Sequence, residues 1–187
     1  MKNNPNDLFC IQRVKAGDIR AFSAIVSNYQ KQVFTIVLKI VANREDAEDI
    51  TQEVFVKVFK SLEQFKEESE FSTWLYRIAY NTTLSELRKR KLSFTSINDN
   101  LDAENEPVDD DEEPDLTGIK LQYLDEALKK LPPDEVFLVT LYYFKEQSIE
   151  AISKVGDLSV ANVKVKLHRI RKKLALEINR LLENEYK

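Results

Sequence analysis

The chain has 187 residues, 43% of them hydrophobic and 32% charged, and its net charge at pH 7 is −4. Three glycines and five prolines are too few for the many tight turns of an all-β fold, and a single cysteine excludes an internal disulfide. No apolar run approaches the roughly 18 residues of a membrane span, and the N-terminus lacks the apolar stretch of a signal peptide. A soluble, cytoplasmic protein of one ordinary domain or two small ones is therefore expected.

An acidic segment divides the chain into two basic parts. Residues 92–119 contain ten acids and neither Lys nor Arg, so the rest of the chain carries a net charge of +6. The segment has few large apolar residues and cannot bury enough surface to offset its ordering entropy. We predict two small domains, residues 7–92 and 119–184, joined by a flexible acidic linker, residues 93–118. The linker is either a solvated spacer or a run of negative charge that lies in a basic channel of a partner.

The first domain is expected to be helical, because its apolar residues recur every three or four positions. A short helix over 7–15 precedes a long one that begins after Asp18, a good N-cap, and ends near residue 43. The next helix has acids crowded into its first turn, where the helix dipole favours anions. Ser72 is expected to cap a third helix that runs to about Arg90.

The second domain shows the same helical spacing. A helix is expected over 121–131, another begins at Pro133, and two more are expected over 148–155 and 159–183, capped by Ser148 and Ser159. No convincing strand is found, so the predicted fold class is all-α.

The last two predicted helices, with a turn at Gly156-Asp157, have the dimensions of a helix-turn-helix. The second helix is basic, with no acid before Glu177. In such motifs the N-terminal part of the second helix enters the major groove, and later cations contact phosphates. A solvated basic helix is the alternative. The candidates for base edges are Val160, Ala161, Asn162 and Lys164, with Lys166 and Arg169 on the DNA backbone.

A second candidate nucleic-acid surface lies on the predicted helix from Ser72. Arg77, Asn81 and Arg88 share its face opposite the apolar one, and Tyr76 and Tyr80 stand beside them. Such a face can bind nucleic acid, including unstacked bases. The alternative is an amphipathic helix with an ordinary basic end.

A third feature is the acidic run from Glu45 to Glu53. Glu45, Asp49 and Glu53 are i,i+4 neighbours, and like charges so placed repel by a few tenths of a kcal/mol. A basic partner or a divalent cation would relieve this repulsion. Carboxylate metal sites in helical bundles draw acids from a second helix as well, and no such second pair is found. A helix start stabilised by the dipole is the remaining alternative.

Several motifs occur together in one order: GDIRAF at 17–22, NREDAEDITQEVF at 43–55, FSTWLYRIAYN at 71–81, LPP at 131–133, and the basic helix at 159–174. The first three resemble region 2 of sigma factors of the extracytoplasmic-function (ECF) group of the sigma-70 family, and the last two resemble region 4. The resemblance covers about residues 8–91 and 120–180. Gly156 and Asp157 stand where the family usually has an apolar residue and then glycine.

The resemblance implies an alternative sigma factor, a non-catalytic subunit that gives bacterial RNA polymerase its promoter choice. Its partners would be core polymerase (the clamp coiled coil of the largest subunit, and the flap), promoter DNA and an anti-sigma factor, often membrane-bound. It implies no catalytic residue, metal, cofactor or small-molecule substrate. The acidic linker would thread a basic channel of the polymerase.

By similarity, three sets of residues have roles. The polymerase-binding residues would be Asp49, Gln52 and Glu53. The −10 element residues would be Ser61, Phe65, Lys66, Arg77, Tyr80, Asn81 and Arg88. The −35 element residues would be Ser159, Val160, Ala161, Asn162, Lys164, Lys166, His168, Arg169 and Lys172.

Two other functions stay open at this point. A free-standing helix-turn-helix regulator would bind duplex DNA alone, usually as a dimer. A magnesium-dependent helical phosphohydrolase would use Glu45, Asp49 and Glu53, although it lacks the second acidic pair.

Overall fold

The computed structural model describes residues 3–94 and 121–185, and within these ranges every regular element is a helix. The predicted all-α fold is therefore confirmed for this part of the chain. The acidic stretch at 95–120, and with it nearly all of the predicted linker, lies outside the described residues.

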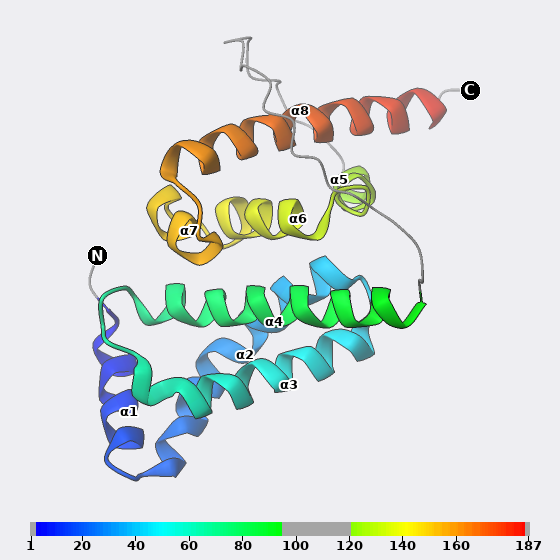
Figure 1. Ribbon diagram of the computed structural model, residues 1–187. Coiled ribbons are helices and arrows are strands. Elements are labelled where there is room, and N and C mark those ends of the chain that lie inside the picture. Colours follow the sequence, from blue (N-terminus) through cyan, green and yellow to red (C-terminus); the bar gives the residue numbers. More distant parts are fainter. Residues whose placement is uncertain (1–2, 95–120, 186–187) are drawn as a thin grey trace.

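The N-terminal domain consists of four α-helices and two short 3₁₀ turns (Figure 1). Apolar residues of the second, third and fourth helices fill its core, among them Ile36, Val54 and Leu75, each almost fully buried. The elements are α1 (Pro5–Lys15), η1 (Ile19–Ala21), α2 (Phe22–Val41), α3 (Arg44–Ser61), η2 (Leu62–Gln64) and α4 (Phe71–Phe94).

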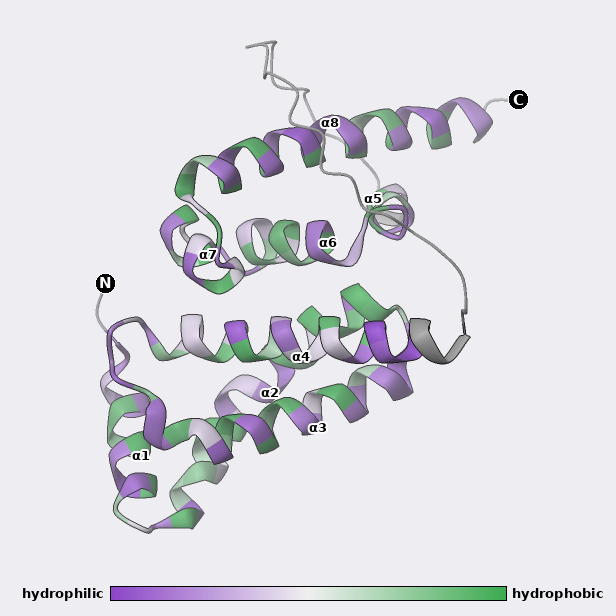
Figure 2. Ribbon diagram, in the orientation of Figure 1, coloured by the Kyte–Doolittle hydropathy of each residue, from purple (hydrophilic) through white to green (hydrophobic). Residues whose placement is uncertain are grey.

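The C-terminal domain consists of four α-helices and one π-turn, and its long last helix crosses the top of the view in Figure 1. The elements are α5 (Leu121–Leu128), α6 (Pro133–Val139), η3 (Thr140–Phe144), α7 (Ile149–Gly156) and α8 (Val160–Glu185). Hydrophobic stretches of both domains turn toward neighbouring helices, and hydrophilic ones turn outward (Figure 2).

Two of the predicted helix caps are confirmed. The Ser148 hydroxyl accepts a hydrogen bond from the Ala151 backbone N–H at 3.1 Å, and the Ser159 hydroxyl accepts one from Asn162 at 3.1 Å. Each bond satisfies one of the donors that a helix leaves without a partner in its first turn. These caps fix where both helices of the helix-turn-helix begin.

The cap predicted at Asp18 is wrong. Its carboxylate forms an ion pair with Arg13 instead of capping, and a 3₁₀ turn separates it from α2. Arg13 lies in the last turn of α1, so the competing cation comes from the preceding helix. Ser72 lies inside α4 and is not its cap, because the helix begins at Phe71.

The turn between α7 and α8 is left-handed at one residue. Asp157 has φ 54° and ψ 45°, and its backbone N–H donates to the carbonyl of Ser153. Across the turn, Ile152 of α7 is buried together with Val163 and Leu167 of α8. The helix-turn-helix predicted from the sequence is thus present, with aspartate in a conformation that glycine adopts most readily.

Substitutions of Asp157 should rank in stability by how well each residue tolerates this conformation. We expect Asp157→Gly to be at least as stable as the parent and Asp157→Ala to be less stable, with a spread of about 1 kcal/mol. Thermal unfolding followed by circular dichroism measures the order. An alanine variant as stable as the parent would show that the turn is not left-handed in solution.

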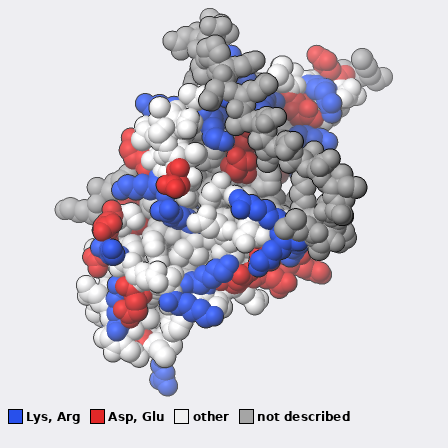
Figure 3. All heavy atoms as spheres, viewed as in Figure 1, with Lys and Arg blue, Asp and Glu red and all other residues white. Residues whose placement is uncertain are grey.

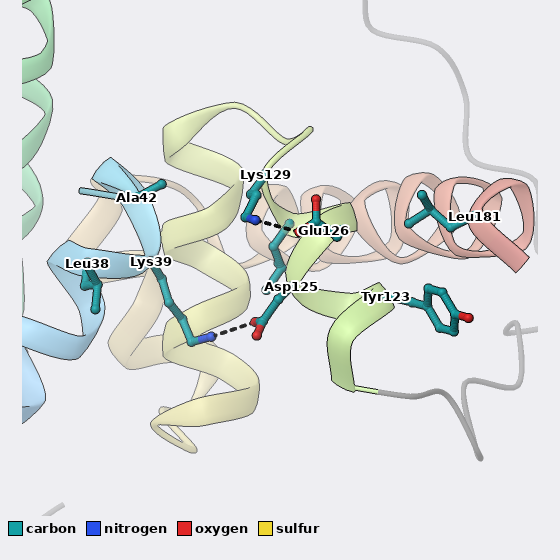
Figure 4. Close-up of a pocket in the computed structure, with 9 residues that line it drawn as sticks. Leu38, Lys39, Ala42, Tyr123, Asp125, Glu126, Lys129 and Leu181 are labelled. Carbon is teal, nitrogen blue, oxygen red and sulfur yellow. Dashed lines mark hydrogen bonds and ion pairs between the residues drawn. The ribbon is translucent and has the colours of Figure 1, made fainter. Parts of the chain in front are cut away.

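The two domains pack against each other. α4 contacts α7, and α2 contacts α6. The rings of Tyr80 and Phe137 lie 4.4 Å apart between centroids. At the edge of this junction the Lys39 ammonium lies 3.4 Å from the Asp125 carboxylate, beside a hollow of about 660 Å³ (Figure 4). The closed arrangement therefore rests on contacts between residues far apart in the sequence.

Candidate nucleic-acid and protein interfaces

The start of α8, from its capping serine to Lys164, presents five of the expected −35 residues together. All are exposed, including Val160 at 37%. They are Ser159, Val160, Ala161, Asn162 and Lys164. This end of the helix is accessible to a DNA groove, as the sequence predicted for a recognition helix.

The middle of α8 is less exposed than its start and forms ion pairs with α6. Lys166 lies 3.4 Å from the Asp134 carboxylate, and Lys173 lies 2.6 Å from Glu135, so the acids at the start of α6 partly neutralise α8. His168 is half-buried, and its Nε2 atom is buried without a hydrogen-bond partner. Arg169 and Lys172 are half-buried as well. Lys166 therefore helps to hold α6, and the later −35 candidates are less exposed than the residues at the start of α8.

The α4 surface brings Arg77, Asn81 and Arg88 together as exposed side chains along one helix. Tyr80 is half-buried because its ring packs on Phe137. Burial raises the pKa of Tyr80, the charge of Asp134 raises it further, and Arg88 lowers it. The phenol therefore stays neutral at physiological pH.

Tyr76, which the sequence placed beside this surface, is a core residue. It is 2% exposed, and its hydroxyl donates a 2.6 Å hydrogen bond to Gln32 of α2. Burial raises the pKa of Tyr76 to about 12. The prediction that its ring faces nucleic acid is wrong for this structure.

The segment between α3 and α4, residues 62–70, is anchored by an aromatic cluster. Phe65, expected to contact DNA, is only 3% exposed, and its ring centroid lies 5.3 Å from Trp74 and 5.6 Å from Phe71. The Lys15 ammonium donates to the Phe65 carbonyl at 2.9 Å. In this structure Phe65 holds the loop in place and does not present its ring.

The same loop and α4 border a hollow of about 420 Å³. Lys66 and Arg77 line it, and Ser61 lies at the end of α3, where its hydroxyl donates to the Lys57 carbonyl at 2.6 Å. Trp74 also lines the hollow. Trp74 was not among the residues expected at this site, because its helical spacing groups it with the inward apolar residues of α4.

The outer face of α3 carries the expected polymerase-binding residues. Asp49 and Gln52 are exposed, and Glu53 pairs with Lys57 at 2.7 Å. Gln52 also borders a shallow groove of about 450 Å³ between α2 and α3, lined on the α2 side by Phe34. The sequence did not identify Phe34, because its position within the apolar α2 pattern gave no sign that it would border a groove.

The acidic run on α3 is partly balanced within the domain. Glu48 pairs with Arg44 at 2.9 Å, and Asp46 pairs with Arg90 of α4. Within residues 3–94 and 121–185, no group of three or more His, Cys, Asp or Glu side chains is placed to hold a metal ion.

Across the face seen in Figure 3, Lys and Arg form a band through the middle with acidic side chains beside it.

Comparison with known proteins decides the family. The model of Sigma-70 region 2 matches residues 25–92, and that of Sigma-70, region 4 matches residues 121–174. The chain is 32% identical to the ECF RNA polymerase sigma-E factor of Haemophilus influenzae, covering 97% of this chain and 100% of that protein. The chain belongs to the ECF group of RNA polymerase sigma factors. This sigma factor is also 30% identical to SigW of Bacillus subtilis, over 91% of the chain and 96% of SigW.

Solved structures of similar fold cover most of this sigma factor. CnrH, in complex with the cytosolic domain of CnrY, is 20% identical with a TM-score of 0.69, covering 94% of this chain and 98% of CnrH. RpoE from Bartonella quintana, in complex with the anti-sigma factor NepR, is 20% identical with a TM-score of 0.64, over 84% of this chain and 96% of that one. In the described ranges of this sigma factor, no helix is both long and apolar enough to cross a bilayer. The family and the fold predicted from the sequence are thereby confirmed.

Proposed function

We propose that this sigma factor binds core RNA polymerase through α3, contacts the −10 element through α4 and its preceding loop, and contacts the −35 element through α8. It is an alternative sigma factor that directs transcription initiation and performs no catalysis of its own. The observation that carries the proposal is the exposed first turn of α8, presented in a chain that also exposes Asp49 and Gln52 on α3. The start of α8 is suited to bind DNA, and the acidic surface of α3 is suited to bind a basic protein.

The α3 surface binds the clamp coiled coil of the largest polymerase subunit. Asp49, Gln52 and Glu53 supply charge and hydrogen bonds, and the groove beside Gln52 supplies an apolar contact at Phe34. The exposed side chain of Val56, one turn beyond Gln52, continues the apolar part of this surface. A polar rim around a desolvated apolar centre is the usual anatomy of a tight protein interface.

The hollow beside Trp74 accepts an unstacked base of the −10 element. Bases stack on aromatic rings, and a cation such as Arg77 can contact the neighbouring phosphate. Extracting a base from the duplex costs a few kcal/mol, which the polymerase complex offsets through its other contacts. Lys66, Asn81 and Arg88 extend this contact along α4.

The first turn of α8 enters the major groove of the −35 element, where Asn162 and Lys164 meet base edges. The C-terminal domain also binds the polymerase flap. With a net charge of −4, the free protein neutralises few phosphates and binds DNA weakly by itself. Polymerase fixes the spacing of the two DNA-binding surfaces, and this raises the effective concentration of the second for its site.

Its further partner is an anti-sigma factor, and its location is the bacterial cytoplasm. The proposal includes no cofactor and no small-molecule substrate. The acidic segment between the domains occupies a basic channel of the polymerase. A free-standing regulator would instead bind promoter DNA with full affinity when polymerase is absent, which a gel-shift assay with and without core enzyme distinguishes.

Replacing Arg169 with alanine should lower promoter binding by the holoenzyme about threefold to thirtyfold, because a charge-assisted contact to the DNA backbone is lost. Polymerase binding should not change, because Arg169 is not one of the proposed polymerase-binding residues, which lie on α3. Filter binding of holoenzyme to promoter DNA gives the first value, and titration of core enzyme with labelled protein gives the second. Equal losses in both would indicate misfolding and contradict the assignment.

A further inference from the structure

The stretch that leads from η2 into α4, residues 65–70, depends on other parts of the fold for its shape. Within the part of the chain that the structure describes, no main-chain group of residues 66–69 bonds to another main-chain group. Glu67 has φ 62°, a left-handed conformation that a glutamate keeps only where surrounding contacts impose it. Side chains from elsewhere in the domain must therefore hold this stretch in place.

One end of residues 65–70 is held by Asn3, which lies just before α1. The side-chain carbonyl of Asn3 accepts a 2.7 Å hydrogen bond from the backbone N–H of Phe71, and its amide donates to the Ser69 carbonyl at 3.4 Å. Phe71 is the first residue of α4, so its N–H is one of the donors that a helix leaves without an internal partner. A side chain 68 positions away thus supplies the cap that the sequence suggested for Ser72.

The other end is held by Lys15, in the last turn of α1. Its ammonium donates to the Phe65 carbonyl at 2.9 Å and to the Glu63 carbonyl at 3.5 Å. Hydrogen bonds from a charged donor are stronger than those between neutral groups. In Figure 1, α1 lies beside the chain that joins α3 to α4, at the left of the view. The two ends of α1 therefore contact the two ends of residues 65–70.

α1 is itself fixed to the core of the N-terminal domain. Its Asp7 carboxylate, only 2% exposed, accepts a hydrogen bond from the hydroxyl of Tyr29 of α2, and Ile11 is 1% exposed. The Tyr29 ring also packs edge-on against Phe71, with centroids 5.5 Å apart. Because these contacts tie α1 to α2 and to the start of α4, α1 is a fixed support for the stretch between α3 and α4.

We propose that α1 sets the specificity of the −10 surface from behind, with Asn3 and Lys15 as positioning residues that hold residues 65–70. The inference rests on the proposed role of this stretch in −10 binding. Lys66 lines the hollow beside Trp74, so the position of the stretch determines the shape of the hollow that accepts the base. The two positioning residues contact no DNA themselves. They act on promoter choice through residues 65–70, and therefore only at the −10 element.

The test compares Asn3→Ala with Asn3→Asp in holoenzyme made with the full chain. Alanine removes the oxygen that accepts from Phe71, whereas aspartate has the shape of asparagine and keeps that oxygen. The charge of the aspartate lies at the N-terminus of α4, where the helix dipole favours an anion. The matched control is Asn6→Ala, which removes the same residue type from an exposed position of α1.

The DNA probe is a duplex that the parent holoenzyme selects from a library with a long randomised stretch. Sequencing of the selected pool gives two blocks of preferred bases, an upstream one for the −35 element and a downstream one for the −10 element. The selected duplex is remade with either block scrambled. Filter binding of holoenzyme to the three duplexes then gives a discrimination ratio for each block, which is the affinity for the intact duplex divided by that for the scrambled one.

We expect Asn3→Ala to lower the downstream discrimination ratio about threefold to tenfold, since the loss of a helix cap shifts an equilibrium by roughly that factor. The upstream ratio should stay at the parent value, and Asn3→Asp should restore the downstream one. A merely structural role of Asn3 would lower both ratios together. Parental discrimination in Asn3→Ala, no restoration in Asn3→Asp, or an equal loss at both blocks would overturn the proposal.

A second variant, Lys15→Met, tests the other end and covers the case in which Asn3→Ala loses its helical circular dichroism. Methionine keeps the apolar stem of the lysine and removes its three donors. Lys130→Met, at an exposed position of the other domain, loses the same charge and controls for a general weakening of DNA binding. The downstream ratio should fall in Lys15→Met and not in Lys130→Met. Equal ratios in these two variants would overturn the proposal.

Trp74 gives a readout that needs no DNA. It is the single tryptophan of the chain, and its ring centroid lies 5.3 Å from that of Phe65 and 5.8 Å from that of Phe71. Acrylamide quenching of Trp74 in the free protein should rise in Asn3→Ala and return to the parent value in Asn3→Asp, and unchanged quenching would overturn the support by α1. A parent holoenzyme that selects no downstream block would reject the proposed function, while the quenching result stands on its own.

Discussion

A protein with both Gln52→Ala and Glu53→Ala should lose its binding to core polymerase and keep its fold. Gln52 is exposed on α3, and the pair between Glu53 and Lys57 is a partly exposed i,i+4 pair that contributes a few tenths of a kcal/mol to the helix. Their loss should therefore cost little stability. At the interface, two central polar residues lost together should weaken binding about a hundredfold or more.

The measurement is a titration of fluorescently labelled protein with core polymerase, with thermal unfolding as the test of the fold. The matched control is Gln12→Ala with Glu63→Ala, which removes the same residue types from exposed positions outside α3. The control should bind as the parent does. Unchanged affinity in the Gln52 and Glu53 variant would reject α3 as the polymerase-binding surface.

Asn162→Ala combined with Lys164→Ala should lower promoter binding by the holoenzyme about thirtyfold or more, because each of the two base contacts contributes roughly 1–3 kcal/mol. Both side chains are exposed in the first turn of α8 and are not needed for packing. If Lys164 also contacts a phosphate, the slope of log affinity against log salt concentration should become less negative by about one. Polymerase binding should stay at the parent value.

Promoter affinity is measured by filter binding at several salt concentrations. Asn179→Ala with Lys130→Ala is the matched control, since both residues are exposed in the same domain but away from the first turn of α8. A control that loses as much affinity as the test variant would show that the loss is not local to the recognition turn. It would remove the basis for assigning base contacts to Asn162 and Lys164.

The helices and the helix-turn-helix were predictable because their signals are local. Ser148 and Ser159 accept bonds from N–H groups three residues away, and Ile152, Val163 and Leu167 meet across one short turn. A sequence window of a dozen residues contains all of this information. The family resemblance had the same source, in motifs that are continuous in the sequence.

The errors come from side-chain contacts between one element and another, which the residue types and helical spacing within a single element do not reveal. Tyr76 was placed at the edge of a polar face, but Gln32 of another helix provides the hydrogen bond that lets its ring be buried. Phe65 belongs to a loop, yet Phe71 and Trp74 enclose it. Aspartate is a favourable N-cap residue, but the Asp18 carboxylate forms an ion pair with Arg13 instead.

The closed packing of the two domains was also beyond prediction from the sequence. Helical periodicity indicates which face of α4 is apolar, but not that Tyr80 on its border packs on Phe137, 57 positions later. The partial burial of Tyr80, an expected −10 residue, depends on that contact. Function could therefore be predicted from the motifs, while the packing of the two domains required the structure.

The most direct test of the central claim is gel filtration of the purified full chain with bacterial core RNA polymerase at moderate salt. We expect co-elution at one to one, and loss of co-elution in the variant with Gln52→Ala and Glu53→Ala. Separate elution of the unaltered chain from the core polymerase of its own organism would contradict it.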